Sequence, residues 1–122
     1  MKFAIVALAV LVACGGSAHT PEPEPHPSKV AHGYATFYDE SQMTASGERF
    51  DKHALTAAHR SLRMGTMVRV TNERNGKTVT VRINDRGPYG NKSRIIDLSE
   101  AAAKRLDMIE AGVVPVTLEV VP

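Results

Sequence analysis

The sequence predicts a small, mainly all-β domain with one short helix, because three of its features agree. Hydrophobic and polar residues alternate over Val68–Val70 and Val79–Ile83, which is the period of a half-buried strand. Asn75-Gly76 lies between these two runs, and this dipeptide is a strong signal for a hairpin turn with positive φ at both positions. Several short strands separated by turn residues indicate a small barrel or a sandwich, and periodicity alone leaves both possible.

Three further segments are expected to form strands. They are Tyr34–Tyr38, Ala54–Ala58 and Val113–Val121. Pro115 lies inside the last one and predicts an edge strand or a bulge there, because proline has no N–H to donate to a sheet.

One helix is expected after Leu98. Ser99 can cap its N-terminus, and Glu100 suits the positive end of the helix dipole. Ala101–Ala103 then favour the helical conformation.

Residues 1–13 have the features of an export signal. Lys2 precedes an apolar run that is long enough for a signal peptide and too short for a transmembrane helix. The run ends at Leu11-Val12-Ala13-Cys14, which resembles the bacterial lipobox, and Cys14 is the only cysteine. The resemblance implies cleavage before Cys14, lipidation (palmitate among the acyl groups) and attachment to the membrane. Gly15 after the cysteine implies the outer membrane, facing the periplasm. The alternative is an ordinary secretory signal with a chance cysteine.

Residues 14–31 are expected to form a disordered tether, and residues 32–122 one folded domain. Proline occurs at every second position from Pro21 to Pro27, which favours an extended chain. The tether offers no large apolar residue for burial, so it has little to hold it folded.

Composition excludes several classes of function. The net charge of +2 is spread along the chain, which argues against nucleic-acid binding. Without tryptophan, and with few other aromatic residues, the core has to be aliphatic. No HExxH sequence, phosphate-binding loop or cysteine pair is present.

Four polar segments concentrate groups that a fold alone does not require. They are Thr44–Asp51, Thr56–His59, Ile83–Tyr89 and Arg94–Ser99, and they contribute the candidate catalytic residues Glu48, His59, Asp85 and Asp97. Cleavage of a glycosidic bond needs one carboxyl group as the acid and usually a second carboxylate. These residue types therefore suit that reaction.

Each candidate also has a structural alternative. Asp85 could organise the turn that follows it, and Asp97 could pair with Arg94 or support the start of the helix. Glu48 could be a solvated loop charge, and His59 a partly buried histidine with its hydrogen bonds satisfied.

Six motifs carry a family resemblance, and they extend from residue 33 almost to the C-terminus. They are GYATFY at 33–38, T..GERFD at 44–51, LTAAHRSL at 55–62, GT.VRVTN at 65–72, VRINDRGP at 81–88 and RIIDLS..AA at 94–103. In order and spacing they resemble the rare lipoprotein A (RlpA) family of septal-ring lytic transglycosylases.

The resemblance implies a six-stranded double-psi β-barrel, the fold shared with expansins and family-45 glycoside hydrolases. It implies a peptidoglycan substrate, in particular glycan strands stripped of stem peptides. Cleavage between N-acetylmuramic acid and N-acetylglucosamine would use no water and leave a 1,6-anhydro end. The resemblance also implies that neither a metal nor a cofactor takes part.

Particular residues match the family's functional positions. Glu48, His59 and Asp85 fall on its proposed active-site positions, and Asp97 falls on the key aspartate of the related expansins and hydrolases. Residues expected to line the substrate groove are Tyr38, Thr44, Arg86 and Tyr89.

The mechanistic hypothesis leaves the acid open between Asp85 and Asp97. One of them would protonate the glycosidic oxygen, and the 6-hydroxyl of the sugar would then close on the anomeric carbon, with the same carboxylate as base. Glu48 and His59 would orient the sugar or tune the pKa of the acid. The main alternative is a non-catalytic, expansin-like wall-binding module, and a third possibility is hydrolysis.

The sequence departs from the family in three places. Phe37 stands where tryptophan is usual, Asp39 where glycine is usual, and Leu62–Gly65 reads LRMG where the family has LPFG. Many members also continue into a glycan-binding SPOR domain. This sequence ends at Pro122, so we expect the barrel and the lipid anchor to localise the protein.

Overall fold

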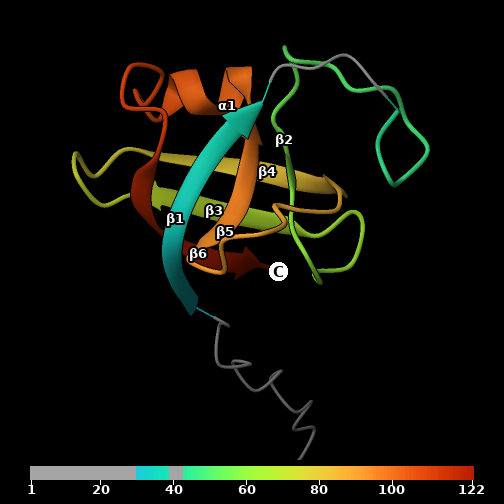
Figure 1. Ribbon diagram of the computed structural model, residues 1–122, viewed down its shortest axis with the longest axis horizontal. Coiled ribbons are helices and arrows are strands. Elements are labelled where there is room, and N and C mark those ends of the chain that lie inside the picture. Colours follow the sequence, from blue (N-terminus) through green and yellow to red (C-terminus); the bar gives the residue numbers. More distant parts are fainter. Residues whose placement is uncertain (1–29, 39–42) are drawn as a thin grey trace, which may run out of the picture.

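The computed structural model describes residues 30–38 and 43–122, which form a closed six-stranded barrel with one helix (Figure 1). The strand order around the barrel is β1-β5-β2-β4-β3-β6, with β1–β5 and β2–β4 parallel and the other pairs antiparallel. This confirms the expected barrel with one short helix. The strands are β1 (Val30–Tyr38), β2 (Thr56–Ala58), β3 (Met67–Asn72), β4 (Thr78–Asp85), β5 (Arg94–Ser99) and β6 (Val114–Val121).

The signal peptide, Cys14 and most of the tether lie outside the described residues, as does Asp39. The domain itself begins earlier than the expected boundary at residue 32. Val30 and Ala31 already pair with Glu119 and Leu118 of β6, so β1 starts at Val30. No helix among the described residues is long and apolar enough to cross a membrane.

The barrel interior is aliphatic, as predicted. Alternate residues of β3 and β4 point inward, and Val68, Val70, Val81 and Ile83 are fully buried. Burial of each such side chain stabilises the fold by about 1.5–3 kcal/mol relative to exposure. This packed interior excludes a ligand from the centre of the barrel, so any site has to lie on its outside or at its ends.

The hairpin between β3 and β4 is present, but its turn differs from the prediction. The loop covers residues 73–77, and Gly76 alone has positive φ in it. Asn75 instead uses its side chain, which donates to the Leu106 carbonyl and accepts from the Lys77 N–H. The longer turn therefore anchors the hairpin to the end of the helix.

Pro115 lies in neither an edge strand nor a bulge, contrary to the prediction. It pairs with Tyr34 of β1, and its carbonyl accepts a hydrogen bond from the Glu73 N–H just beyond β3. The missing N–H costs little here, because the β3 ladder ends one residue away, at the Asn72–Val116 pair.

The helix α1 (Glu100–Arg105) follows β5 directly and covers one end of the barrel (Figure 1). Ser99 caps it as predicted, with its side chain accepting from the Ala102 N–H. The Ser99 hydroxyl also donates to the Ala54 carbonyl at 2.6 Å. The cap thereby ties the helix to the segment that leads into β2.

The β1–β5 pair contains one irregularity. Tyr34 pairs with Arg94, whereas the next residue, Ala35, pairs with Ile96, so Ile95 is an extra residue in β5. Gly33 makes room for it, since a Cβ on Gly33 would lie 2.8 Å from Ile95 Cγ2. We call this feature the Ile95 bulge.

Candidate active site

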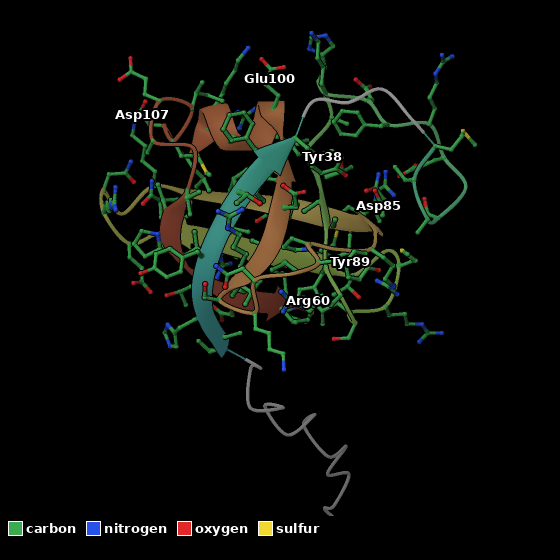
Figure 2. All side chains as sticks on the ribbon, in the orientation of Figure 1. Tyr38, Arg60, Asp85, Tyr89, Glu100 and Asp107 are labelled. Carbon is green, nitrogen blue, oxygen red and sulfur yellow. The ribbon has the colours of Figure 1, made fainter. Side chains whose placement is uncertain are left out.

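A cavity of about 460 Å³ lies on the outside of the barrel, where β1, β2, β4 and β5 meet. Figure 2 shows Asp85 and Tyr89 on the same side of the barrel, away from Glu100 and Asp107 at the helical end. The lining of the cavity combines two carboxylates, two arginines and an aromatic rim. The lining residues are Thr36, Phe37, Tyr38, Ala58, Asp85, Arg86, Gly87, Pro88, Tyr89, Arg94 and Asp97.

Two of the predicted catalytic carboxylates face each other across Ala58. Ala58 of β2 pairs with Asp85 of β4 on one side and with Asp97 of β5 on the other. Residues that pair directly across neighbouring strands present their side chains on the same face. The methyl group of Ala58 leaves open the space between the two carboxylates, and a larger side chain would fill it.

The Asp97 carboxylate is partly shielded from solvent. Burial raises its pKa, and the Thr36 hydroxyl opposes this by donating to Oδ1 at 2.9 Å. The charge of Asp85 raises the pKa further, and the charge of Arg94 lowers it. A carboxyl group whose pKa is raised in this way can hold a proton that an exposed aspartate would lose. The predicted alternative role, an ion pair with Arg94, is not found among the described residues.

Asp85 is held as a hydrogen-bond acceptor. Its Oδ1 accepts from the backbone N–H groups of Ala45 and Arg86, each at 2.8 Å, and its Oδ2 from the Tyr38 hydroxyl at 3.4 Å. The Arg86 contact shows that Asp85 also organises the turn after β4. Its carboxylate is therefore fixed in orientation while it faces the cavity.

Tyr38 connects the cavity to the loop that follows β1. Its ring stacks on Phe50 with the centroids 4.6 Å apart. Burial and the charges of Asp85 and Asp97 raise the pKa of its hydroxyl far above the ordinary value. Tyr38 therefore stays a neutral phenol that donates to Asp85.

Glu48 does not line the cavity. Its carboxylate pairs with the Arg82 guanidinium at 3.0 Å and accepts from the Asn84 amide. Hydrogen bonds from Arg82 and Asn84 lower its pKa, so it is a poor proton donor. Its loop nevertheless carries Ala45, whose N–H holds Asp85. The structure thus places Glu48 behind the cavity, supporting the strand end that carries Asp85.

His59 also lies behind the cavity. Its Nδ1 accepts from the N–H groups of Ser61 and Leu62, at 3.1 and 3.0 Å, which places the ring proton on Nε2. Burial, Arg86 and Arg60 lower its pKa, so the ring is neutral near pH 7. His59 shapes the turn whose carbonyls receive the Arg86 guanidinium.

Three of the four residues predicted to line the groove do line the cavity, and the fourth does not. Tyr38, Arg86 and Tyr89 line the cavity, and Tyr89 is 75% exposed at its rim. Thr44 is 5% exposed and bonds within its own loop, to the Glu48 carbonyl and the Ser46 hydroxyl. It therefore stabilises the loop and is not among the residues that line this cavity.

Several cavity or wall residues were not predicted, among them Thr36, Ala58 and Arg60. Thr36 has a signal in the sequence, because it lies two residues before Tyr38 on the same strand face. Ala58 has none, because its importance depends on which strands flank β2. Arg60 holds the loop after β4, donating to the carbonyls of Pro88, Asn91 and Arg94 at 2.7–2.8 Å.

Among the described residues, no three His, Cys, Asp or Glu side chains form a group that could hold a metal ion. The cavity instead offers what acid–base chemistry on a sugar requires. It has one shielded carboxyl group, one carboxylate fixed by hydrogen bonds, and an exposed aromatic ring at the rim.

The chain is similar to several known proteins. The family model described as lytic transglycolase matches residues 30–118. The endolytic peptidoglycan transglycosylase RlpA of Campylobacter jejuni is 49% identical over 96 residues, which cover 76% of this chain and 34% of that protein. The chain thus spans about a third of the length of that relative.

Two solved structures share the barrel. The Streptomyces papain inhibitor has a TM-score of 0.66 and 26% identity, covering 79% of this chain and 98% of its own. An expansin of Clavibacter michiganensis has a TM-score of 0.62 and 25% identity, covering 76% of this chain and 50% of its own. The same barrel therefore occurs in proteins with very different names, and function has to be inferred from the cavity.

Proposed function

The chain belongs to the lytic transglycolase family and has its expected double-psi β-barrel, and from that premise we propose that it cleaves peptidoglycan glycan strands. The bond cleaved joins N-acetylmuramic acid to N-acetylglucosamine, the product ends in a 1,6-anhydro sugar, and the reaction serves cell wall remodelling. The observation that carries the proposal is the pairing of Asp85 and Asp97 with the same small residue, Ala58, at one open cavity.

Asp97 is the acid in this proposal. Its raised pKa allows it to give a proton to the glycosidic oxygen as the bond from that oxygen to the anomeric carbon breaks. The 6-hydroxyl oxygen of the muramic acid residue then bonds to the anomeric carbon. Its proton passes to the Asp97 carboxylate, so the acid is restored and no water is consumed.

Asp85 stabilises the positive charge that develops on the sugar ring. Its carboxylate is oriented in advance by Ala45, Arg86 and Tyr38, so no reorganisation is needed when that charge appears. Two carboxylates in environments that give them different tasks are the usual requirement for cleaving a glycosidic bond.

The test uses the full chain with purified peptidoglycan, intact or stripped of stem peptides by an amidase. Soluble products are identified by mass spectrometry, with Asp97→Asn and Asp85→Asn as variants. Anhydro-ended glycans that disappear with Asp97→Asn support the proposal. Reducing-end sugars would instead identify a hydrolase and overturn the anhydro step.

A non-catalytic wall-binding module is the second candidate, because the barrel is shared with the Clavibacter michiganensis expansin. It predicts that the chain sediments with peptidoglycan and that Asp97→Asn changes no product, since none is formed. Binding without products would favour this candidate.

We further propose that the protein is anchored by lipid on Cys14, at the outer membrane and facing the periplasm. The support is the sequence Leu11-Val12-Ala13-Cys14 followed by Gly15. Radiolabelled palmitate should be incorporated into the chain and not into Cys14→Ser. Equal labelling of the two would contradict the anchor.

A further inference from the structure

Two arginines, Arg86 and Arg94, line the cavity, and a third, Arg60, holds the loop after β4 that contributes to its wall. Two of these three arginines are engaged in holding the fold. Arg60 donates to carbonyls of the loop after β4, and Arg86 donates to the carbonyls of His59 and Leu62. Arg94 differs from both. Within residues 30–38 and 43–122 its guanidinium makes no hydrogen bond or ion pair, although it lines the cavity beside Asp97.

The Ile95 bulge accounts for the position of Arg94. In a regular strand, residues 94 and 97 would point to opposite faces, because side chains alternate. The extra residue reverses the alternation, so that Arg94 and Asp97 both face the cavity while Ile96 points into the core. Bulges next to active sites commonly redirect a side chain in this way.

An unpaired guanidinium in a cavity is suited to bind a carboxylate of the ligand, since its planar set of donors matches the two carboxylate oxygens. The charge of Arg94 lowers the pKa of Asp97, but the two side chains form no ion pair in the described structure, because no atom of the Asp97 carboxylate comes within ion-pair distance of Arg94. Among residues 30–38 and 43–122, the cavity therefore offers one guanidinium without a hydrogen-bond or ion-pair partner next to the proposed acid.

We propose that Arg94 forms an anion subsite that binds the free lactyl carboxylate of a muramic acid residue. This inference rests on the proposed function, which supplies the class of glycan. The lactyl group is attached to the same sugar ring whose anomeric carbon reacts, so its binding group has to lie beside the acid, as Arg94 does. In a strand that carries stem peptides this carboxylate is an uncharged amide, and Arg94 then has no anion to bind.

The experiment compares two forms of one peptide-stripped glycan, with the lactyl carboxylates either free or converted to neutral amides by carbodiimide coupling to ammonium. Binding is measured by calorimetry with the full chain carrying Asp97→Asn, where no cleavage is expected. Arg94→Gln is the test variant. Arg105→Gln is the matched control, because Arg105 is an exposed cation on α1 and does not line the cavity.

We expect the chain with Arg94 to bind the acidic glycan about tenfold more tightly than the amidated one, the effect of one charge-assisted contact in a partly exposed site. Arg94→Gln should bring the two affinities together by weakening only the acidic glycan, and Arg105→Gln should leave the ratio unchanged. An unchanged ratio in Arg94→Gln, or no binding of either glycan, overturns the subsite.

Cleavage of the acidic glycan by the chain that retains Asp97 is followed in parallel. If that chain forms no product but the affinity ratio depends on Arg94, the transglycosylase proposal fails and the anion subsite stands. If products form but the affinity ratio does not depend on Arg94, the anion subsite fails and the transglycosylase proposal stands.

Discussion

The Thr36 hydroxyl donates a hydrogen bond to Asp97 Oδ1 at 2.9 Å, from the strand next to the one that carries the proposed acid. This bond stabilises the ionised carboxylate and so opposes the effect of burial, which raises the pKa of Asp97. The proton affinity of Asp97 is thus set by two neighbouring strands together.

Thr36→Val should therefore move the pH profile of cleavage. The acid has to be protonated, so the rate falls as pH rises through the pKa of Asp97. Loss of the Thr36 hydroxyl raises that pKa further, and the alkaline limb of the profile should move to higher pH. Rates measured across pH on peptide-stripped glycan test this, with Thr36→Ser as the control that keeps the hydroxyl. A limb that stays in place, or moves to lower pH, contradicts the role of Asp97.

Asp97→Asn should abolish cleavage and at the same time stabilise the fold near pH 7. The folded-state pKa of Asp97 is raised above the ordinary value of 3.8, so between these two pKa values the folded state binds more protons than the unfolded state. Stability is then lost as pH rises through this window. Asparagine carries no charge at any pH and avoids the loss.

Urea unfolding at about pH 3 and about pH 7 measures this difference. The free energy of unfolding of Asp97→Asn should exceed that of the wild type only at the higher pH, because the wild-type carboxyl group is neutral at the lower pH. An equal gain at both pH values would indicate a packing effect and would count against a shielded carboxyl group.

Glu48→Ala should reduce cleavage by about tenfold to a hundredfold by an indirect route, within the range over which misplaced catalytic groups lose rate. The change leaves the Asn84 amide, on a residue 2% exposed, without its acceptor, and it frees Arg82. The loop that carries Ala45 is then less well held against Asp85.

Glu48→Gln is the matched variant, because its amide oxygen can still accept from Asn84. It should recover a large part of the activity, with the alkaline limb of the pH profile unmoved in both variants. A complete loss in Glu48→Gln, equal to that of Asp97→Asn, would show that the Glu48 carboxylate takes part in the chemistry itself.

His59→Asn should preserve the turn that His59→Ala disrupts. The asparagine Oδ1 can replace Nδ1 as acceptor for the N–H groups of Ser61 and Leu62. Removing an acceptor from such N–H groups costs about 1–3 kcal/mol where they are buried, and less at this partly exposed turn. Chemical unfolding of the two variants measures the difference, and equal destabilisation would argue against His59 Nδ1 as the acceptor that stabilises this turn.

His59 should also make the free energy of unfolding depend on pH. The folded-state pKa of His59 lies below its ordinary value of 6.5, so its contribution to stability is present above that value and is lost as pH falls. His59→Asn should flatten this part of the profile of unfolding free energy. An identical slope in both proteins would show that another group titrates there.

Much of the fold could be predicted from local patterns. The alternation in β3 and β4 and the Ser99 cap depend on neighbouring residues, and both are found as predicted. The Asn75-Gly76 turn was predicted wrongly, because Asn75 forms a hydrogen bond to Leu106, which is distant in the sequence.

The site was less accessible to prediction. The family motifs identified Asp85 and Asp97, but motifs do not show that both flank Ala58, since that depends on β2 pairing with two strands at once. Strand alternation would place Arg94 on the face opposite Asp97. The Ile95 bulge reverses this, and its only trace in the sequence is Gly33, which no local rule connects with residue 95.

Gly33→Ala tests whether the Ile95 bulge positions Arg94. The new methyl group would lie 2.8–2.9 Å from three side-chain carbons of Ile95, so the bulge has to shift. Forcing a methyl group into packed structure of this kind typically costs about 1–3 kcal/mol. We expect a lower melting temperature and a smaller preference for the acidic glycan.

The double variant Gly33→Ala with Ile95→Ala removes the clash from the other side. If the two positions act through this contact, their effects are not additive, and the double variant should melt at a higher temperature than the sum of the single changes predicts. Its preference for the acidic glycan should also return toward that of the wild type, because Arg94 regains its position beside Asp97. Additive losses in both measurements would mean that Gly33 acts on the strand independently of Ile95, and the bulge would then have no part in aiming Arg94.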